Sequence, residues 1–125
     1  MKRRLAILLW ATDPDLPHLC ATPFFHASAA AAMDIEVEMF FTSKSIRLLE
    51  KGVADALYPG AGRERSVAQY MREAHGFGAK FFACSQAMAA HGVAAGALIA
   101  EVTDYAGAAA FMARALDEGW ATLSY

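Results

Sequence analysis

The chain has few cysteines and no long apolar run, and each shortage excludes a class of protein. Its 125 residues include only two cysteines, Cys20 and Cys84, which are too few for a disulfide-stapled secreted domain. The two are not in a CxxC arrangement. No apolar stretch reaches the roughly 18 residues that a membrane span needs. We therefore expect no disulfide framework and no membrane span.

The chain also has no large excess of positive or negative charge. The net charge is −2 with the signs well mixed, so no basic stripe indicates a nucleic-acid partner. The start "MKRRLAILLWATDPD" has the basic and apolar parts of a signal peptide, but the apolar stretch covers only 5–11. Asp13, Pro14 and Asp15 stand where small residues would allow cleavage. We interpret this segment as a buried first strand and expect a cytoplasmic protein.

Apolar residues are abundant, at 57% of a chain with the length of one ordinary domain. This composition suffices for a sizeable core within a single domain, 1–125. The excess over a typical soluble chain indicates a second buried surface, such as an oligomer interface.

Apolar runs alternate with helix-like stretches along the whole chain. Strands are expected over 4–12, 35–42, 79–85, 97–105 (weak and short) and 119–125. Helices are expected over 23–33, 44–52, 63–78, 85–92 and 107–119. The alternation predicts an α/β fold with three layers, in which helices cover both faces of a five-stranded parallel sheet.

Helix boundaries carry their own signals. Thr22 before Pro23 is typical of an N-cap followed by the first helical residue, and Gly52 and Gly92 are typical of helix ends. In the last helix the spacing predicts three inward-facing side chains, which are Phe111, Ala115 and Leu116.

Cys84 stands where an apolar strand, "AKFFACS", becomes a helix. The carboxyl ends of parallel strands gather ligands and reactive groups, so residues 10–12, 41–43 and 83–85 are expected at one edge. The first free N–H groups of the helix, over 86–88, would favour a thiolate, which is the reactive form of cysteine. The alternative is that Cys84 is a small buried hydrophobe.

Cys20 lies in the proline-rich loop after the first strand and is therefore expected near the same edge. It is either a second thiol that receives sulfur or resolves an intermediate, or a loop cysteine without such a role. His18 is a candidate neighbour of Cys84, whereas His91 lies two helical turns beyond it. A zinc site from His18, Cys20 and Cys84 lacks a recognised ligand spacing, and no metal or cofactor is expected.

The segment "GAGRERS", residues 60–66, has the glycines of a phosphate-binding loop but not its GK[ST] ending. A plain flexible loop is the better interpretation. No Ser-His-Asp set and no paired acids at strand ends indicate hydrolysis.

Three stretches together give the chain a family resemblance. They are "ASAAAAMDIEVEMFFTSKSIRLLEKG", "GAKFFACSQAMAAHGV" and the closing "GWATLSY". Their order and spacing, over nearly the whole chain, resemble the DsrE/DsrF/TusD family of sulfur-relay proteins. The resemblance implies a five-stranded parallel sheet, homotrimers or hexamers, and a cysteine that carries sulfane sulfur as a persulfide, at Cys84. It also implies partners such as a TusA-like sulfur carrier protein and other sulfur-transferring or sulfur-oxidising proteins.

The leading hypothesis is therefore a persulfide carrier, or sulfurtransferase, that works through Cys84. Phe41, Phe81 and Phe82 are expected to form part of an apolar wall around the persulfide, although strand alternation sends the last two to opposite faces. Some members of the resembled family lack the cysteine, so a non-catalytic subunit or binding module is the first alternative. A redox protein that forms a Cys20–Cys84 disulfide is the second.

Overall fold

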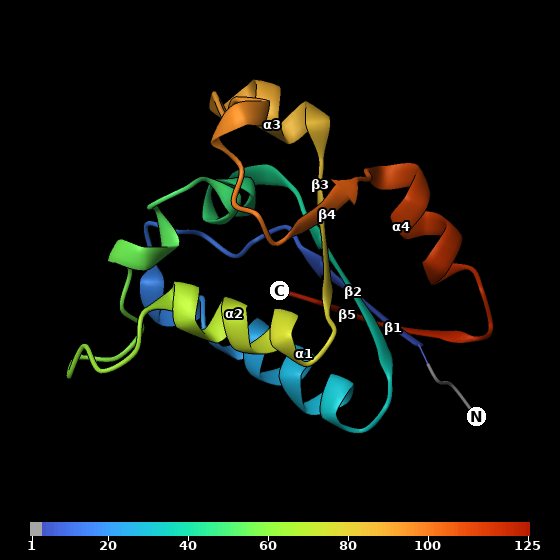
Figure 1. The fold of residues 1–125 in the computed structure, drawn as a ribbon. Helices are drawn as coiled ribbons and strands as arrows, with labels where there is room; N and C mark the ends of the chain where they lie inside the picture. The colour runs from blue at the N-terminus through green and yellow to red at the C-terminus, as the bar shows by residue number, and fades with distance from the viewer. Residues whose placement is uncertain (1–3) are drawn as a thin grey trace.

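The computed structural model describes residues 4–125 and shows an α/β fold (Figure 1). The strands are β1 (Arg4–Leu9), β2 (Glu36–Phe41), β3 (Lys80–Ala83), β4 (Val102–Tyr105) and β5 (Trp120–Ser124). The α-helices are α1 (Thr22–Ala32), α2 (Val67–Gly76), α3 (Ser85–His91) and α4 (Ala108–Ala115). Short 3₁₀ helices are η1 (Pro17–Leu19), η2 (Ser43–Leu49), η3 (Ala54–Ala56) and η4 (Ala95–Ala97). None of the helices in this part of the chain combines the length and the apolar character needed to cross a bilayer.

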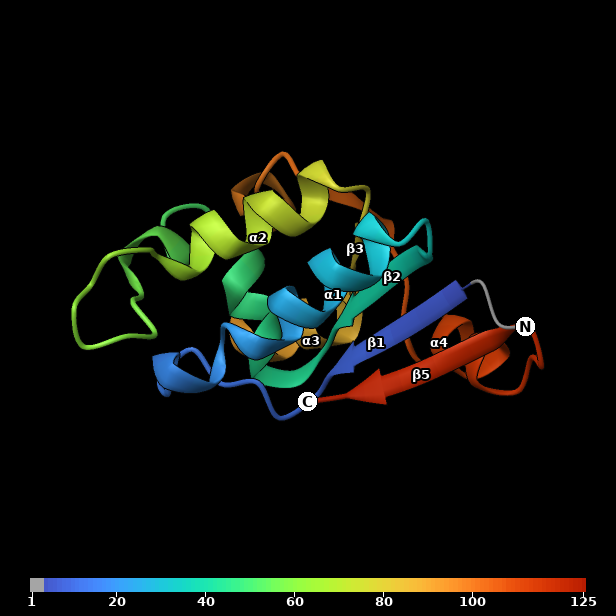
Figure 2. The same ribbon diagram turned by 90° about the horizontal axis from the view of Figure 1, so that it is seen from below.

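All strand pairs are parallel, in the order β4-β3-β2-β1-β5. Figure 2 shows β3, β2, β1 and β5 side by side in this order. Leu9 is in register with Phe41, and Phe41 with Ala83, so the carboxyl ends of the three central strands meet at one edge. The predicted five-stranded parallel sheet between helices is confirmed.

The main core lies between the sheet and the pair α1 and α2. Alternate strand residues point to this face, and Phe41 and Phe81 are fully buried there. Phe24 of α1 packs against both rings, with centroid distances of 6.1 and 6.2 Å. Burying one such side chain contributes about 1.5–3 kcal/mol, so this face supplies most of the apolar stabilisation.

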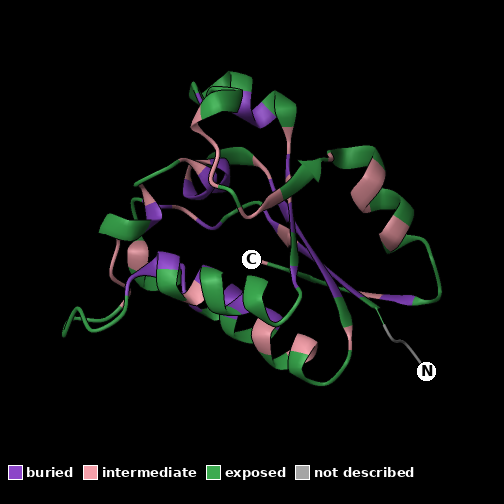
Figure 3. Cartoon of the chain, viewed as in Figure 1, coloured by how far each residue is buried: buried purple, intermediate pink, exposed green. Residues whose placement is uncertain are grey.

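The opposite face has a much smaller core. Ala6, Phe40 and Trp120 are buried there, and Phe111 of α4 packs on them at 5.6 Å from the Phe40 ring. No residue of α4 itself is fully buried (Figure 3). This helix is the whole helical cover of the second face within residues 4–125, so the third layer is thin.

The predicted inward face of the last helix is only partly correct. Phe111 packs inward, but Ala115 is exposed and Leu116 is 79% exposed. The helix ends at Ala115, and a turn in which Gly119 donates to the Asp117 side chain leads directly into β5. The early end leaves Leu116 outside the contact with the sheet.

The predicted helix over 44–52 is the 3₁₀ helix η2, which ends at Leu49, so Gly52 lies in the turn beyond it and does not close the helix. The buried Ser45 hydroxyl donates to the carbonyl oxygens of Leu9 and Thr42, at 2.7 and 2.6 Å. These bonds hold the segment against the ends of β1 and β2. A 3₁₀ helix is wound more tightly than an α-helix. In η2 this winding buries three apolar side chains, Ile46, Leu48 and Leu49.

Other boundaries differ by one to a few residues. Thr22 is the first residue of α1 rather than its N-cap, and Pro23 follows within the first turn. Helix α2 begins only after Ser66, because Ser66 and Gln69 form a capping box that fixes the start. The fourth strand, predicted over 97–105 as weak and short, is limited to Val102–Tyr105. Gly92 ends α3 in the left-handed conformation, as predicted.

Candidate functional site

Cys84 is held by backbone hydrogen bonds on both sides. Its amide donates to the carbonyl oxygen of Phe41 at 3.1 Å, which continues the ladder between β2 and β3. Its own carbonyl accepts from the amide of Met88 at 3.0 Å, in the first turn of α3. The thiol therefore stands at the strand-to-helix junction that the sequence indicated, on a fixed backbone.

The segment after β4 lies beside this thiol. The amide of Ala106 donates to the carbonyl oxygen of Ala83 at 3.0 Å, which ties the segment to the end of β3. A Cβ atom placed on Gly107 would lie 3.9 Å from the Cys84 Sγ. Gly107 has a φ of −121°, which residues with side chains also adopt. The glycine thus leaves space beside the sulfur and does not serve an unusual backbone conformation.

Cys84 opens onto a cavity of about 300 Å³ on the α4 side of the sheet, the Cys84 pocket. Its lining comes from strand ends, the start of α3 and the first turns of α4, and consists of Leu8, Phe40, Phe41, Thr42, Cys84, Gln86, Ala106, Gly107, Ala108, Phe111 and Met112. None of these lining residues is charged. The pocket is therefore a half-open apolar site with one thiol and two neutral polar side chains.

The predicted wall needs correction. Phe41 lines the pocket, but Phe81 and Phe82 are not among the lining residues. Phe81 is buried in the main core, and Phe82 stacks on Phe40 at 5.3 Å on the other face. The predicted alternation of these two rings is thus correct.

The predicted donation from the first N–H groups of α3 to the sulfur is absent. Within residues 4–125, no side-chain hydrogen bond caps the start of α3. The side chain of Cys84 turns instead toward Gly107 and the pocket.

Cys20 has a different environment from Cys84. It is completely buried, and its thiol donates to the carbonyl oxygens of Asp13 and Leu16, at 3.3 and 3.6 Å. Burial, together with the nearby Asp13 carboxylate, raises the pKa of Cys20 from an ordinary value of 9.0 to about 11. Cys20 packs in the main core, whereas Cys84 is half-buried and lines the pocket. Both thiols are free.

The loop that contains Cys20 is braced by ion pairs to η2. Lys44 contacts Asp13 and Asp15 at 3.5 and 3.4 Å, and Arg47 contacts Asp15 at 3.4 Å. The hydrogen bond from Lys44 is the main cause that lowers the pKa of the Asp15 carboxyl. Exposed pairs of this kind contribute little each, and their effect is to orient the loop.

The two histidines considered from the sequence, His18 and His91, are not among the residues that line the Cys84 pocket. His18 is exposed on η1, and His91 is exposed at the end of α3. No group of three His, Cys, Asp or Glu side chains that could hold a metal occurs in the described part of the chain. The conceivable zinc site of His18, Cys20 and Cys84 is therefore not assembled.

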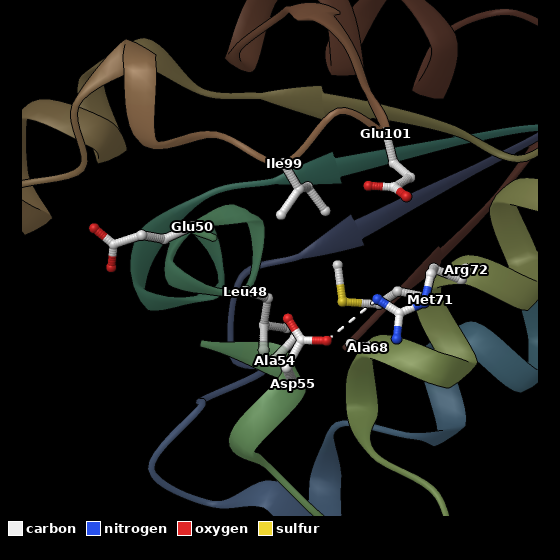
Figure 4. Close-up of a pocket in the computed structure, with 9 residues that line it drawn as sticks. All are labelled: Leu48, Glu50, Ala54, Asp55, Ala68, Met71, Arg72, Ile99 and Glu101. Carbon is white, nitrogen blue, oxygen red and sulfur yellow. Dashed lines mark hydrogen bonds and ion pairs between the residues drawn. The ribbon is translucent and has the colours of Figure 1, made fainter. Parts of the chain in front are cut away.

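Two other hollows offer less chemistry. One, shown in Figure 4, lies between η3, α2 and the segment before β4, where Arg72 and Asp55 pair at 3.2 Å. Its volume of about 20 Å³ suits a single water molecule. The other lies on the glycine-rich loop, where Arg65 stacks on Tyr70 and pairs with Glu73 at 2.7 Å. Arg65 is thus paired with a carboxylate, and Arg63, which also lines this hollow, lies over the Tyr58 ring.

Sequence reasoning missed the contribution of residues 106–112 to the pocket. The available signal was Gly107, which follows the fourth strand directly and lies at the same edge as Cys84 if β4 is the neighbour of β3. Alternation of strands and helices does not disclose strand order, so that neighbour relation required the structure.

Comparison with known proteins adds to this geometry. Residues 7–125 match the model of the DsrE/DsrF-like family. The fold is similar to that of the YchN protein from E. coli, with a TM-score of 0.76 and 14% identity over 100% of both chains. It is also similar to MTH1491, a protein of unknown function from Methanobacterium thermoautotrophicum, with a TM-score of 0.69 and 18% identity over 99% of this chain and 100% of that one. No curated protein gives a significant match.

Proposed function

Because the chain belongs to the DsrE/DsrF-like family, we propose that it carries sulfane sulfur as a persulfide on Cys84 in a sulfur relay. The observation that carries this proposal is the position of Cys84. It is a free, half-buried thiol on a rigid strand end, and it opens onto an apolar pocket. A carrier thiolate attacks the sulfane sulfur of a donor and later presents that sulfur to an acceptor thiolate, so it needs access on one side.

The pocket also suits the loaded state. A persulfide is prone to further oxidation in water, and the apolar side chains of Leu8, Phe40 and Phe111 would shield it. The space beside Gly107 would admit the second sulfur atom. Within residues 4–125, no N–H group in the first turn of α3 donates a hydrogen bond to the Cys84 Sγ, so we assign stabilisation of the persulfide anion to groups that the sulfur-donating or sulfur-accepting protein brings.

The two-cysteine redox alternative is less well supported. A disulfide would require Cys20 to leave the core and lose its contacts with the carbonyl groups of Asp13 and Leu16. A non-catalytic subunit remains the alternative if Cys84 takes up no sulfur.

The decisive experiment is sulfur loading followed by mass spectrometry. Wild-type protein and the variants Cys84→Ser and Cys20→Ser are incubated with inorganic polysulfide and then digested. We expect one or more added sulfur atoms on Cys84 in wild type and in Cys20→Ser, and none at residue 84 in Cys84→Ser. Serine is nearly isosteric, so circular dichroism should show folded protein in all three cases.

Two outcomes would contradict the proposal in different ways. A reduced wild-type Cys84 that gains no sulfur would refute the carrier function and favour the non-catalytic subunit. Complete loss of loading in a folded Cys20→Ser variant would show that the roles of the two thiols are assigned wrongly.

The partners that we propose are a small sulfur carrier of the TusA type and other sulfur-transferring proteins, within the cytoplasm. We further propose assembly into a trimer or a hexamer. The thin cover of the α4 face and the exposure of Met112, Leu116 and Leu123 support a second buried surface. Light scattering at micromolar concentration should give three or six times the chain mass, and a monomer mass would contradict this assembly.

A further inference from the structure

We propose that the Cys84 pocket binds the uncharged organic group of a small persulfide, R–S–SH, which donates its sulfane sulfur to Cys84. This inference rests on the proposed function and adds to it the chemical class of the donor. The inference is based on the residues that line the Cys84 pocket, and not on the thiol itself.

The lining selects against charge. Leu8, Phe40 and Phe111 supply aliphatic and aromatic surface, and Thr42 and Gln86 supply neutral polar groups. No Lys, Arg, His, Asp or Glu belongs to the lining residues. A carboxylate or ammonium that entered would lose hydration and gain no ion pair, which is strongly unfavourable. An uncharged apolar group would gain from burial instead.

The size of the pocket points the same way. A volume of about 300 Å³ lies at the lower end of the range for small-molecule sites. It accommodates one compact aliphatic or aromatic group next to the sulfur. The half-open mouth allows such a molecule to enter and its thiol product to leave.

The position of the sulfur fits a transfer from inside the pocket. A Cβ atom on Gly107 would lie 3.9 Å from the Cys84 Sγ, so the missing side chain leaves room for a second sulfur in that direction. The Cys84 thiolate attacks the outer sulfur of R–S–SH, and a new S–S bond forms to Cys84. The S–S bond of the donor breaks, and its electron pair leaves with R–S⁻, which takes a proton from water. The sulfur moves without net oxidation or reduction.

The test compares donors by charge. Loading rates at residue 84 are measured by mass spectrometry with benzyl persulfide, which is neutral outside its S–SH group, and with glutathione persulfide, which has charged groups. Each rate is divided by the rate of the same donor with a small free thiol, which removes intrinsic reactivity. We expect wild type to favour benzyl persulfide at least tenfold.

Two neighbouring alanines give a matched pair of variants. Ala108 and Ala109 are both exposed on α4, but only Ala108 lines the pocket. Ala108→Leu should lower the benzyl rate at least tenfold relative to the rate with inorganic polysulfide, whereas Ala109→Leu should leave this ratio unchanged. Met112→Lys places a cation in the lining and should reduce the preference for benzyl over glutathione persulfide about tenfold.

The outcomes separate this inference from the proposed function. If Cys84 loads from polysulfide but shows no preference between the organic donors, or if the two leucine variants behave alike, the uncharged-donor inference is wrong and the carrier function stands. If Cys84 loads from no donor, the carrier function itself fails.

Discussion

The two faces of the sheet differ in how completely they are covered. On the α1 and α2 face, Phe24, Phe41 and Phe81 pack together in a core without exposed surface. On the α4 face, the buried apolar side chains within residues 4–125 are Ala6, Phe40 and Trp120, and a pocket of about 300 Å³ remains. Cys20 lies in the first environment alone, whereas Cys84 packs against the edge of that core and also lines the pocket.

This difference shows how one small fold separates stability from chemistry. The filled face fixes the strands, and through Phe41 and Ala83 it fixes the backbone of Cys84. The incompletely covered face leaves a thiol accessible at a defined position. A thiol placed in the filled core, such as Cys20, has its pKa raised and loses access to reagents.

The claimed difference between the two faces would be contradicted if both contributed equally to the free energy of unfolding. We expect Phe24→Ala to lower the free energy of unfolding by about 3–5 kcal/mol, since it empties a fully buried site. Phe111→Ala should cost only about 1 kcal/mol, because this ring is partly exposed. Urea unfolding monitored by circular dichroism measures both.

Two results with these variants would change the interpretation of the α4 face. Equal losses for the two phenylalanines would show that the α4 face is a full core in solution. A loss for Phe111→Ala that grows with protein concentration would indicate that another copy of the chain covers this face.

Thiol labelling compares the two faces through the reactivity of one cysteine on each, Cys20 and Cys84. At pH 8 the Cys20 thiolate is about one thousandth of the total, because its pKa is about 11, and its sulfur is fully buried. We expect native Cys84 to react with iodoacetamide at least 100-fold faster than Cys20. The rates are read from the peptides after digestion, with the unfolded protein in urea as the control. Similar rates in the native protein would contradict the assignment of Cys20 to the closed core.

The smallest effect is a pH dependence of stability. Cys20 keeps its proton in the folded state up to a pKa of about 11, whereas the unfolded chain loses it near 9.0. Between these values the folded state binds more protons, so stability is fully present below pH 9 and falls as the pH rises toward 11. The slope from this group is at most about 1.4 kcal/mol per pH unit.

The control for this prediction is Cys20→Ser, which removes the titrating group. The difference in unfolding free energy between wild type and Cys20→Ser should change over pH 9–11 and be constant below pH 8. A difference that stays constant through pH 11 would contradict the raised pKa.

Much of this architecture was predictable because it depends on local patterns. Nearly all-apolar runs such as 4–12 and the junction at Cys84 reflect burial on both faces of a parallel strand, and the structure has β1 (Arg4–Leu9) and β3 there. The type of η2 was not predictable, because it depends on a hydroxyl of Ser45 that bonds to the distant end of β1 at Leu9 as well as to the nearby Thr42. The pocket was missed for a similar reason, because Gly107 and Phe111 join Cys84 only through strand order.

The hydrogen bonds at the sheet edge have a consequence for engineering. The amides of Thr42, Cys84 and Ala106 bond to the last carbonyl groups of β1, β2 and β3, at 3.3, 3.1 and 3.0 Å. These three bonds link successive strand ends across the sheet, and they fix the backbone position of Cys84 without contacts from the side chains of α4. Helix α4 has no fully buried residue, so its exposed positions can be changed at small cost in folding energy if Phe111, which packs on Phe40, and Arg114, which pairs with the buried Glu38, are kept. The position of the Cys84 sulfur and the exposed surface of α4 beside the pocket can therefore be altered separately. Substitutions on α4 should change which molecules the pocket accepts and leave the backbone of Cys84 in place.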